Sequence, residues 1–184
     1  MKVTAAKIPG LLIIEPTVYA DTRGFFMETY SQDRYAKAKL PTRFVQDNLS
    51  LSMQGTLRGL HLQHPHGQGK LCTVFEGEVF DVAVDVRTGS PSFGQWEGIR
   101  LSSESMRQLY IPPGFAHGFC VLSDRALFSY KCTEIYTSEN EIGVAWNDED
   151  IGIEWPIDDP CLSHKDSRNP RLRDLPPDRL PRYH

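Results

Sequence analysis

The chain has 184 residues, of which 40% are hydrophobic and 24% are charged, and its formal net charge is −4. These values are typical of one soluble globular domain and exclude a disordered or fibrous chain. The negative charge also argues against non-specific binding to nucleic acid, although a few converging arginines and lysines can still form a pocket for a small anion.

Most of the chain is predicted to form short strands separated by turns. The period of two is clearest in residues 79–86 and 126–132. One helix is predicted over Gln32–Lys39, with Ser31 as its N-cap and Pro41 as its stop. In chain order the strand candidates are Gly10–Ile14, Gly24–Tyr30, Phe44–Leu51, Lys70–Phe75, Val79–Val86, Gly98–Leu101, Gln108–Ile111, His117–Leu122 and Ala126–Cys132.

Many short strands with so little helix favour an all-β sandwich or barrel. We expect residues 1–184 to form a single domain. The segment 167–184 is rich in proline and arginine, so we expect it to run as an extended tail over the surface.

The cysteines and the N-terminal segment point to a cytoplasmic protein. The apolar stretch Ile8–Ile14 is broken by a proline and a glycine, is too short to span a bilayer and has no cleavage site. No CxxC spacing or paired framework is present among Cys72, Cys120, Cys132 and Cys161. We therefore expect no disulfides and no membrane association.

The densest polar signal is Gln46-Asp47-Asn48, followed by residues 55–63 with the sequence GTLRGLHLQ. In a regular strand, Arg58 and His61 point to opposite faces. Both can enter one pocket only if the strand twists or bulges near Gly59, and a glycine within a strand often marks a bulge or a close approach of backbones.

His61 alone would more often be a core histidine than a catalytic one, but further polar groups coincide with it. Tyr130 shares a strand face with Phe128 and Cys132, so its hydroxyl is expected to be buried and hydrogen-bonded. Lys70 opens an apolar strand shortly after His61. Asp166, near the end of the chain, supplies an acid that could orient a histidine.

A metal site is the alternative for these histidines. The segment 113–117, PGFAH, matches the second half of the metal-binding motif of cupin sandwiches, and His64-Pro65-His66 resembles the first half. Lys70 stands where the carboxylate ligand would be, and an ammonium group beside a divalent cation is unfavourable. We therefore expect no metal at these histidines.

Taken together, the motifs resemble the dTDP-4-dehydrorhamnose 3,5-epimerase family over roughly residues 8–166. The resemblance implies a cupin-like jelly-roll β-sandwich with one or two short helices. It also implies a cofactor-free isomerase that converts dTDP-4-dehydro-6-deoxy-D-glucose into dTDP-4-dehydro-L-rhamnose, in dTDP-L-rhamnose biosynthesis. The motifs are DTRGFFME at 21–28, QDNLS at 46–50, RGLH at 58–61, DVAVDVR at 81–87, GFAHGF at 114–119, WND at 146–148 and LSHKD at 162–166.

The resemblance also implies roles for individual residues. In catalysis, His61 is the base, Asp166 orients it, Tyr130 is the acid on the opposite face of the sugar and Lys70 stabilises the enolate oxygen. The binding residues are Arg23, Arg58 and Lys165 for the diphosphate, Tyr136 for stacking on thymine, His117 for lining the sugar pocket, and Glu28, Gln46, Asn48 and Glu141 for other contacts with the base and sugar.

The family pattern places Arg23 and Glu28 in the site of a partner subunit, which implies a homodimer with exchange of N-terminal strands. Two alternatives stay open at this point. One is an epimerase that inverts only C3 or C5 in another dTDP-deoxysugar pathway, and the other is a non-catalytic jelly roll that binds a sugar nucleotide. A metal-dependent cupin oxygenase is disfavoured by Lys70.

Overall fold

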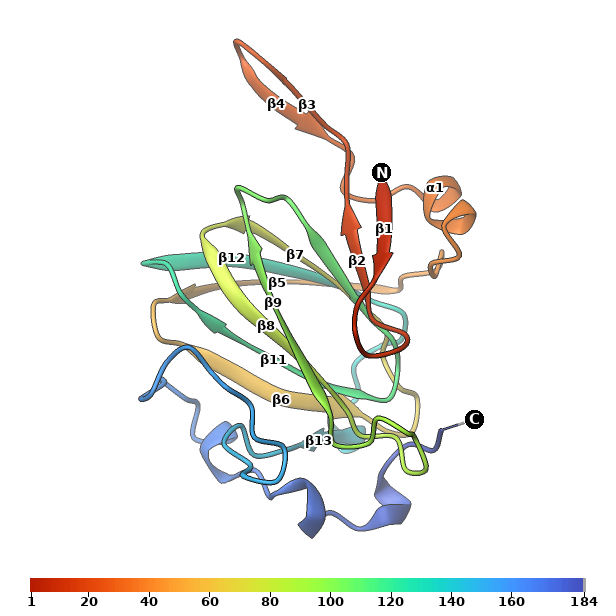
Figure 1. The fold of residues 1–184 in the computed structure, drawn as a ribbon, viewed down its shortest axis with the longest axis vertical. Coiled ribbons are helices and arrows are strands. Elements are labelled where there is room, and N and C mark those ends of the chain that lie inside the picture. Colours follow the sequence, from red (N-terminus) through yellow and green to blue (C-terminus); the bar gives the residue numbers. More distant parts are fainter. Residues whose placement is uncertain (184) are drawn as a thin grey trace.

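The computed structural model describes residues 1–183 and is built mostly from β-strands in two packed antiparallel sheets (Figure 1). The all-β sandwich predicted from the strand pattern is confirmed. The six-stranded sheet has the order β1 (Lys2–Ala5), β2 (Leu12–Glu15), β10 (Gln108–Ile111), β7 (Lys70–Glu76), β12 (Arg125–Cys132), β5 (Gln46–Met53). The five-stranded sheet has the order β13 (Glu141–Gly143), β6 (Leu57–Gln63), β11 (Phe115–Val121), β8 (Glu78–Asp85), β9 (Trp96–Ser102).

The hairpin of β3 (Val18–Asp21) and β4 (Gly24–Met27) projects away from the two sheets (Figure 1). The helix α1 (Gln32–Lys37) begins where it was predicted but ends two residues early, because Lys39 has a left-handed φ of 60°. Among residues 1–183, no helix is long and apolar enough to cross a membrane. The four short 3-10 helices are η1 (Ser138–Asn140), η2 (Asp166–Arg168), η3 (Leu172–Asp174) and η4 (Pro177–Arg179).

The strand β8 is covered on both faces, and this determines how its side chains are distributed. Val79 and Ala83 face the core between the two sheets, whereas Val82 and Val84 belong to a second core on the outer face of the five-stranded sheet. By the same alternation Asp81 points into the sandwich with Val79 and Ala83. An acidic side chain is thereby placed inside the protein, close to the site described below.

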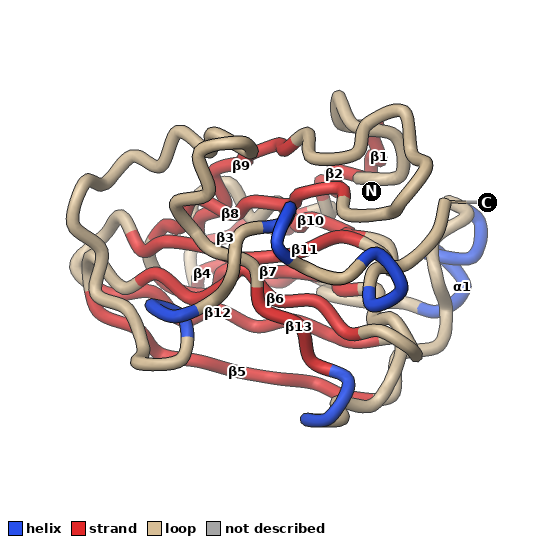
Figure 2. The backbone as a smooth tube through the Cα atoms, turned by 90° about the horizontal axis from the view of Figure 1, so that it is seen from below, coloured by secondary structure: helices blue, strands red, loops and turns tan. Residues whose placement is uncertain are grey.

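The C-terminal segment differs from the extended surface tail that we expected. It contains η3 and η4 and lies along the outer face of the five-stranded sheet, where Figure 2 shows these short helices in front of the strands. Its three leucines, Leu172, Leu175 and Leu180, are buried in the second core. The expectation of an extended tail rested on the proline and arginine content and did not consider these leucines. Their burial removes apolar surface from water and so holds the segment against the sheet.

Candidate active site

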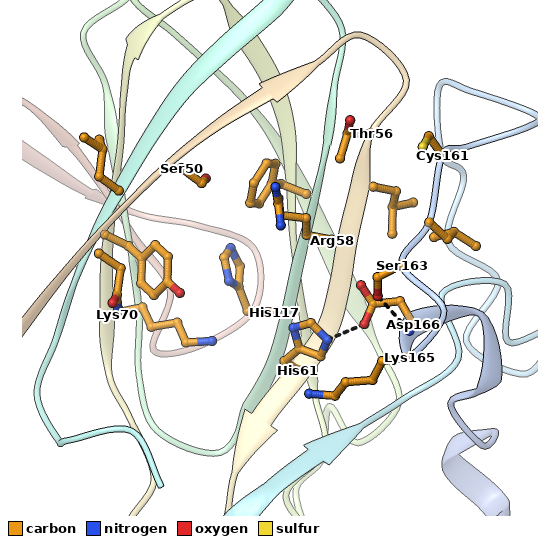
Figure 3. A pocket seen from close by; sticks show the side chains of 16 residues that line it. Ser50, Thr56, Arg58, His61, Lys70, His117, Cys161, Ser163, Lys165 and Asp166 are labelled. Carbon is orange, nitrogen blue, oxygen red and sulfur yellow. Dashed lines mark hydrogen bonds and ion pairs between the residues drawn. The ribbon is translucent and has the colours of Figure 1, made fainter. Parts of the chain in front are cut away.

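A cavity of about 570 Å³ lies between the two sheets and the segment 161–166 (Figure 3). Its walls come from β5, β6, β7, β11 and β12, so both sheets contribute side chains. Most of the residues predicted for catalysis or binding line it, namely Asn48, Arg58, His61, Lys70, His117, Tyr130, Lys165 and Asp166.

Arg58 and His61 reach the same cavity because β6 bulges at Gly59. In the pairing with β11, His61 is opposite His117 and Arg58 is opposite Phe119, so three steps along β6 match two along β11. Gly59 has a φ of +129°, and a Cβ atom there would lie 2.5 Å from a backbone atom of β11. Only glycine fits this close approach. The bulge that a shared pocket requires is therefore present.

His61 and Asp166 form a close pair, with 2.6 Å between Nε2 and Oδ1. The carboxyl group is buried, which would raise its pKa, but hydrogen bonds from His61 and Ser163 outweigh burial and hold the pKa of Asp166 below its ordinary value. The ionised carboxylate keeps the imidazole proton on Nε2. The other ring nitrogen, Nδ1, points toward the cavity (Figure 3).

Tyr130 and Lys70 come from the six-stranded sheet, so they face His61 from the other wall of the cavity. Burial raises the pKa of Tyr130 to about 12, which keeps its hydroxyl protonated at neutral pH. We predicted a buried hydroxyl; the Tyr130 residue as a whole is half-buried, because it lines the cavity as well as the core. Lys70 is buried, and burial lowers its pKa; its Nζ lies 5.9 Å from the centre of the Tyr130 ring.

A second histidine–aspartate pair lies beside the first, and no role was predicted for its acid. His117 Nε2 is 3.0 Å from Asp81 Oδ1, and both residues are buried. Burial lowers the pKa of His117 more than the charge of Asp81 raises it, so the ring is neutral at pH 7. Cys72 Sγ lies 3.8 Å from the same nitrogen. The signal that could have identified Asp81 is its position as an acid on the inner face of an apolar strand.

The cupin metal motif is not assembled as its sequence match suggested. Among residues 1–183, the side chains close enough together to hold a metal ion are Cys72, Asp81 and His117. His117 thus belongs to a group without His64 or His66. The buried Lys70 ammonium interacts with Cys72 and Asp81, so it opposes a cation at this place.

Five of the predicted binding residues form one hydrogen-bonded chain beside the cavity. The Gln46 amide donates to Asn48 Oδ1 over 3.0 Å, and its carbonyl oxygen accepts from the backbone N–H of Tyr136 over 2.8 Å. The Tyr136 hydroxyl donates to Glu141 Oε2 over 2.8 Å, and Lys165 pairs with the same oxygen. Since Asn48 and Lys165 both line the cavity, this series of hydrogen bonds connects two side chains of the cavity wall.

The remaining two predicted binding residues do not line the cavity of their own chain. Arg23 lies at the turn of the β3–β4 hairpin and pairs with Asp21 over 2.7 Å, and Glu28 pairs with Arg34 over 3.1 Å. The hairpin projects away from the sheets (Figure 1). Arg23 can therefore serve a substrate site only if the hairpin meets another molecule.

The match to a family model settles the affiliation of the chain. The model described as dTDP-4-dehydrorhamnose 3,5-epimerase matches residues 5–174. The chain belongs to the dTDP-4-dehydrorhamnose 3,5-epimerase family. The enzyme of that name from Shigella flexneri is 52% identical over 176 residues, which cover 95% of this chain and 97% of the relative.

A solved structure and a more specialised relative extend this comparison. RmlC from Legionella pneumophila, a dTDP-6-deoxy-D-glucose-3,5-epimerase in complex with dTDP-4-keto-L-rhamnose, has a TM-score of 0.97 at 49% identity, covering 100% of this chain and 98% of that chain. A dTDP-4-dehydrorhamnose 3-epimerase from Streptomyces niveus is 43% identical over 90% of this chain and 81% of its own length.

These comparisons confirm the family that the sequence motifs resembled. They also confirm the cupin jelly-roll fold and the class of enzyme, an isomerase with dTDP-4-dehydrorhamnose 3,5-epimerase activity in dTDP-L-rhamnose biosynthesis. The predicted small-molecule partner, a dTDP-linked sugar, is confirmed with them.

Proposed function

We propose that His61 is the base and Tyr130 the acid that invert C3 and C5 of dTDP-4-dehydro-6-deoxy-D-glucose, giving dTDP-4-dehydro-L-rhamnose. The observation that carries this proposal is the placement of the two groups in one cavity but on opposite sheets, with Asp166 bound to His61. A sugar ring between the sheets presents one face to the base and the other to the acid. Inversion requires this arrangement.

In the first step, His61 Nδ1 accepts the proton from C3 or C5, which the neighbouring 4-keto group makes acidic. The electron pair of the broken C–H bond moves into the bond to C4, and the carbonyl electrons move onto O4 to give an enolate. The buried Lys70 ammonium stabilises this oxyanion electrostatically. The neutral His117 ring lines the same sugar pocket.

In the second step, Tyr130 donates its hydroxyl proton to the same carbon from the opposite face, and the enolate returns to a ketone. Protons then exchange with solvent, which restores His61 and Tyr130 before the next inversion. No electrons are gained or lost overall, so the proposed sequence needs no redox cofactor.

The nucleotide is proposed to lie along the rim of the cavity. Arg58 and Lys165 line it and carry the positive charge that suits a diphosphate. The exposed ring of Tyr136 suits stacking on thymine. Gln46, Asn48 and Glu141, which belong to the same hydrogen-bonded chain, are proposed to contact the base and sugar.

We further propose that a second copy of this chain completes the site. The strand β5 keeps most of its polar side chains partly or fully buried and exposes its apolar ones. Leu49, which also lines the edge of the cavity, Leu51 and Met53 are 65%, 56% and 62% exposed. The hairpin exposes four more large apolar side chains, Val18, Tyr19, Phe25 and Phe26. A homodimer with exchanged hairpins would cover these surfaces and bring Arg23 and Glu28 to the partner's cavity.

The cytoplasm is the proposed compartment. All four cysteines are free thiols, and three of them are buried. Free thiols are the usual state of cysteine in a reducing environment.

Incubation of the purified protein with dTDP-4-dehydro-6-deoxy-D-glucose in D₂O tests the proposed reaction against its alternatives. We expect deuterium at both C3 and C5, as counted by NMR. Deuterium at one carbon alone would mean that the enzyme inverts a single centre in another dTDP-deoxysugar pathway. Deuterium at neither carbon would leave a protein that only binds the sugar nucleotide.

A further inference from the structure

The loop that carries Tyr136 is held by the side chains of two glutamines, one from each sheet. Gln63 Nε2 donates to the carbonyl oxygen of Ile135 over 3.1 Å, and Gln63 Oε1 accepts from the N–H of Thr137 over 2.9 Å. Gln46 Oε1 accepts from the N–H of Tyr136 itself. Side-chain amides therefore hold both peptide groups of Tyr136 and flank it on either side.

Gln63 is the buried member of this pair, with only 4% of its surface exposed. Its amide nitrogen also donates to the carbonyl oxygen of His66 over 2.7 Å, so both N–H donors and the oxygen are used. A buried amide with all of its groups satisfied has one well-defined position. Since Gln63 bonds to the backbone on both sides of Tyr136, its fixed position also fixes the backbone of this loop.

The Tyr136 side chain is held at its far end as well, because its hydroxyl donates to Glu141. The residue nevertheless remains 47% exposed, so its aromatic side chain is accessible to a ligand. A contact surface that is ordered before binding loses less entropy when the ligand arrives. The two anchors thus prepare the ring for stacking without covering it.

Gln63 also stands two residues after His61 on the same strand, β6. The position of the base-stacking ring is thereby tied to the strand that carries the catalytic base. Such a link keeps the distance between the nucleotide end and the sugar end of the cavity constant.

We propose that Gln63 is a positioning residue, which sets the Tyr136 ring for the thymine base and acts on substrate binding rather than on proton transfer. This inference rests on the proposed role of Tyr136. Gln63→Met removes all three hydrogen bonds at nearly constant volume. Gln54→Met is the matched control, because Gln54 bonds to the carbonyl oxygen of Leu122, far from the Tyr136 loop in the sheet pairing.

Affinities for dTDP and for inorganic pyrophosphate, measured by calorimetry, separate positioning from general damage. Gln63→Met should weaken dTDP roughly 5- to 20-fold and raise KM similarly, with kcat and pyrophosphate affinity nearly unchanged. Gln54→Met should match the wild type. Equal weakening of both ligands, or a fall in kcat at constant KM, would overturn the inference. If Gln63→Met does not fold, Gln63→Asn serves instead, since its shorter amide cannot span the same bonds.

A double variant distinguishes failure of this inference from failure of the proposed stacking. If Gln63 acts through Tyr136, adding Gln63→Met to Tyr136→Ala should cause no further loss of dTDP affinity. Additive losses would show that Gln63 acts independently, and the inference would be wrong. If Tyr136→Ala alone binds dTDP like the wild type, the stacking role itself fails, and with it the purpose assigned to Gln63.

Discussion

Replacement of Asp166 by asparagine tests the orientation of the base with little change in shape. The carboxylate accepts from His61 Nε2 at 2.6 Å and lies near the N–H of Gly59, at 3.5 Å from its second oxygen. An asparagine that offers its carbonyl oxygen to Gly59 must present its NH₂ group to His61. The imidazole proton then moves to Nδ1, and the cavity loses its free base.

The expected loss can be worked from these contacts. A hydrogen bond to a charged group contributes about 1.5–3 kcal/mol, which corresponds to a rate change of roughly 10- to 150-fold. Loss of the correct tautomer adds to this, and a positioned general base contributes about 10²–10⁴-fold in total. We therefore expect kcat of Asp166→Asn to fall about 10²–10⁴-fold with little change in KM, because the carboxylate acts through His61.

Steady-state kinetics and deuterium wash-in at C3 and C5 should show the same loss. Asp150→Asn is the control, since Asp150 is exposed and pairs with Arg173 on the surface. A kcat of Asp166→Asn within about tenfold of wild type would refute the reasoning, because the tautomer would then be set by something other than Asp166.

Three further predictions follow from the same site. Because burial lowers the pKa of Lys70 and its charged form is the active one, kcat should fall as pH rises through a value below the ordinary lysine pKa of about 10.4; a profile that is flat to that pH would contradict the role. An equimolar mixture of inactive Arg23→Ala and inactive His61→Ala should regain about a quarter of the wild-type activity, because half of the dimers are mixed and each mixed dimer has one intact site. If the subunits exchange and the mixture stays inactive, the two chains do not share a site. Activity should survive a chelator, and loss that one specific divalent ion restores would assign a metal to the cavity.

The strands were the most predictable part of the fold, because their signal is local. The alternation at 79–86 and 126–132 corresponds to β8 and β12 within one residue at each end, and β10 has the predicted bounds. The short strands β1, β3 and β13 were not predicted. β1 and β3 are exposed along nearly their whole length and β13 has only three residues, so none shows the alternation of a half-buried strand.

Two features could not be inferred from the local sequence pattern: which face of β5 is exposed, and the burial of the leucines in the C-terminal segment. Alternation shows that β5 has two faces, but the apolar face with Leu51 lies outside because the polar face borders the cavity. The leucines of the tail are buried only because the outer face of the five-stranded sheet is there to receive them. Both features depend on tertiary context.

The candidate site was predictable through its motifs rather than through geometry. His61 and Asp166 are 105 positions apart, and no spacing rule brings them together; the resemblance to a family supplied the pair and the structure its 2.6 Å contact. Asp81 and Gln63 stand inside or beside the same motifs, yet their contacts with His117 and with the Tyr136 loop become visible only in three dimensions.

Solvent exchange in two variants tests the division of labour between base and acid most directly. In D₂O, His61→Ala should neither invert the sugar nor exchange its C3 and C5 protons, because no carbanion forms. Tyr130→Phe should stop productive inversion but retain exchange, with deuterium returned from the His61 side. Equal loss of exchange in both variants, or near-normal turnover in His61→Ala, would contradict the assignment of His61 as the base and Tyr130 as the acid.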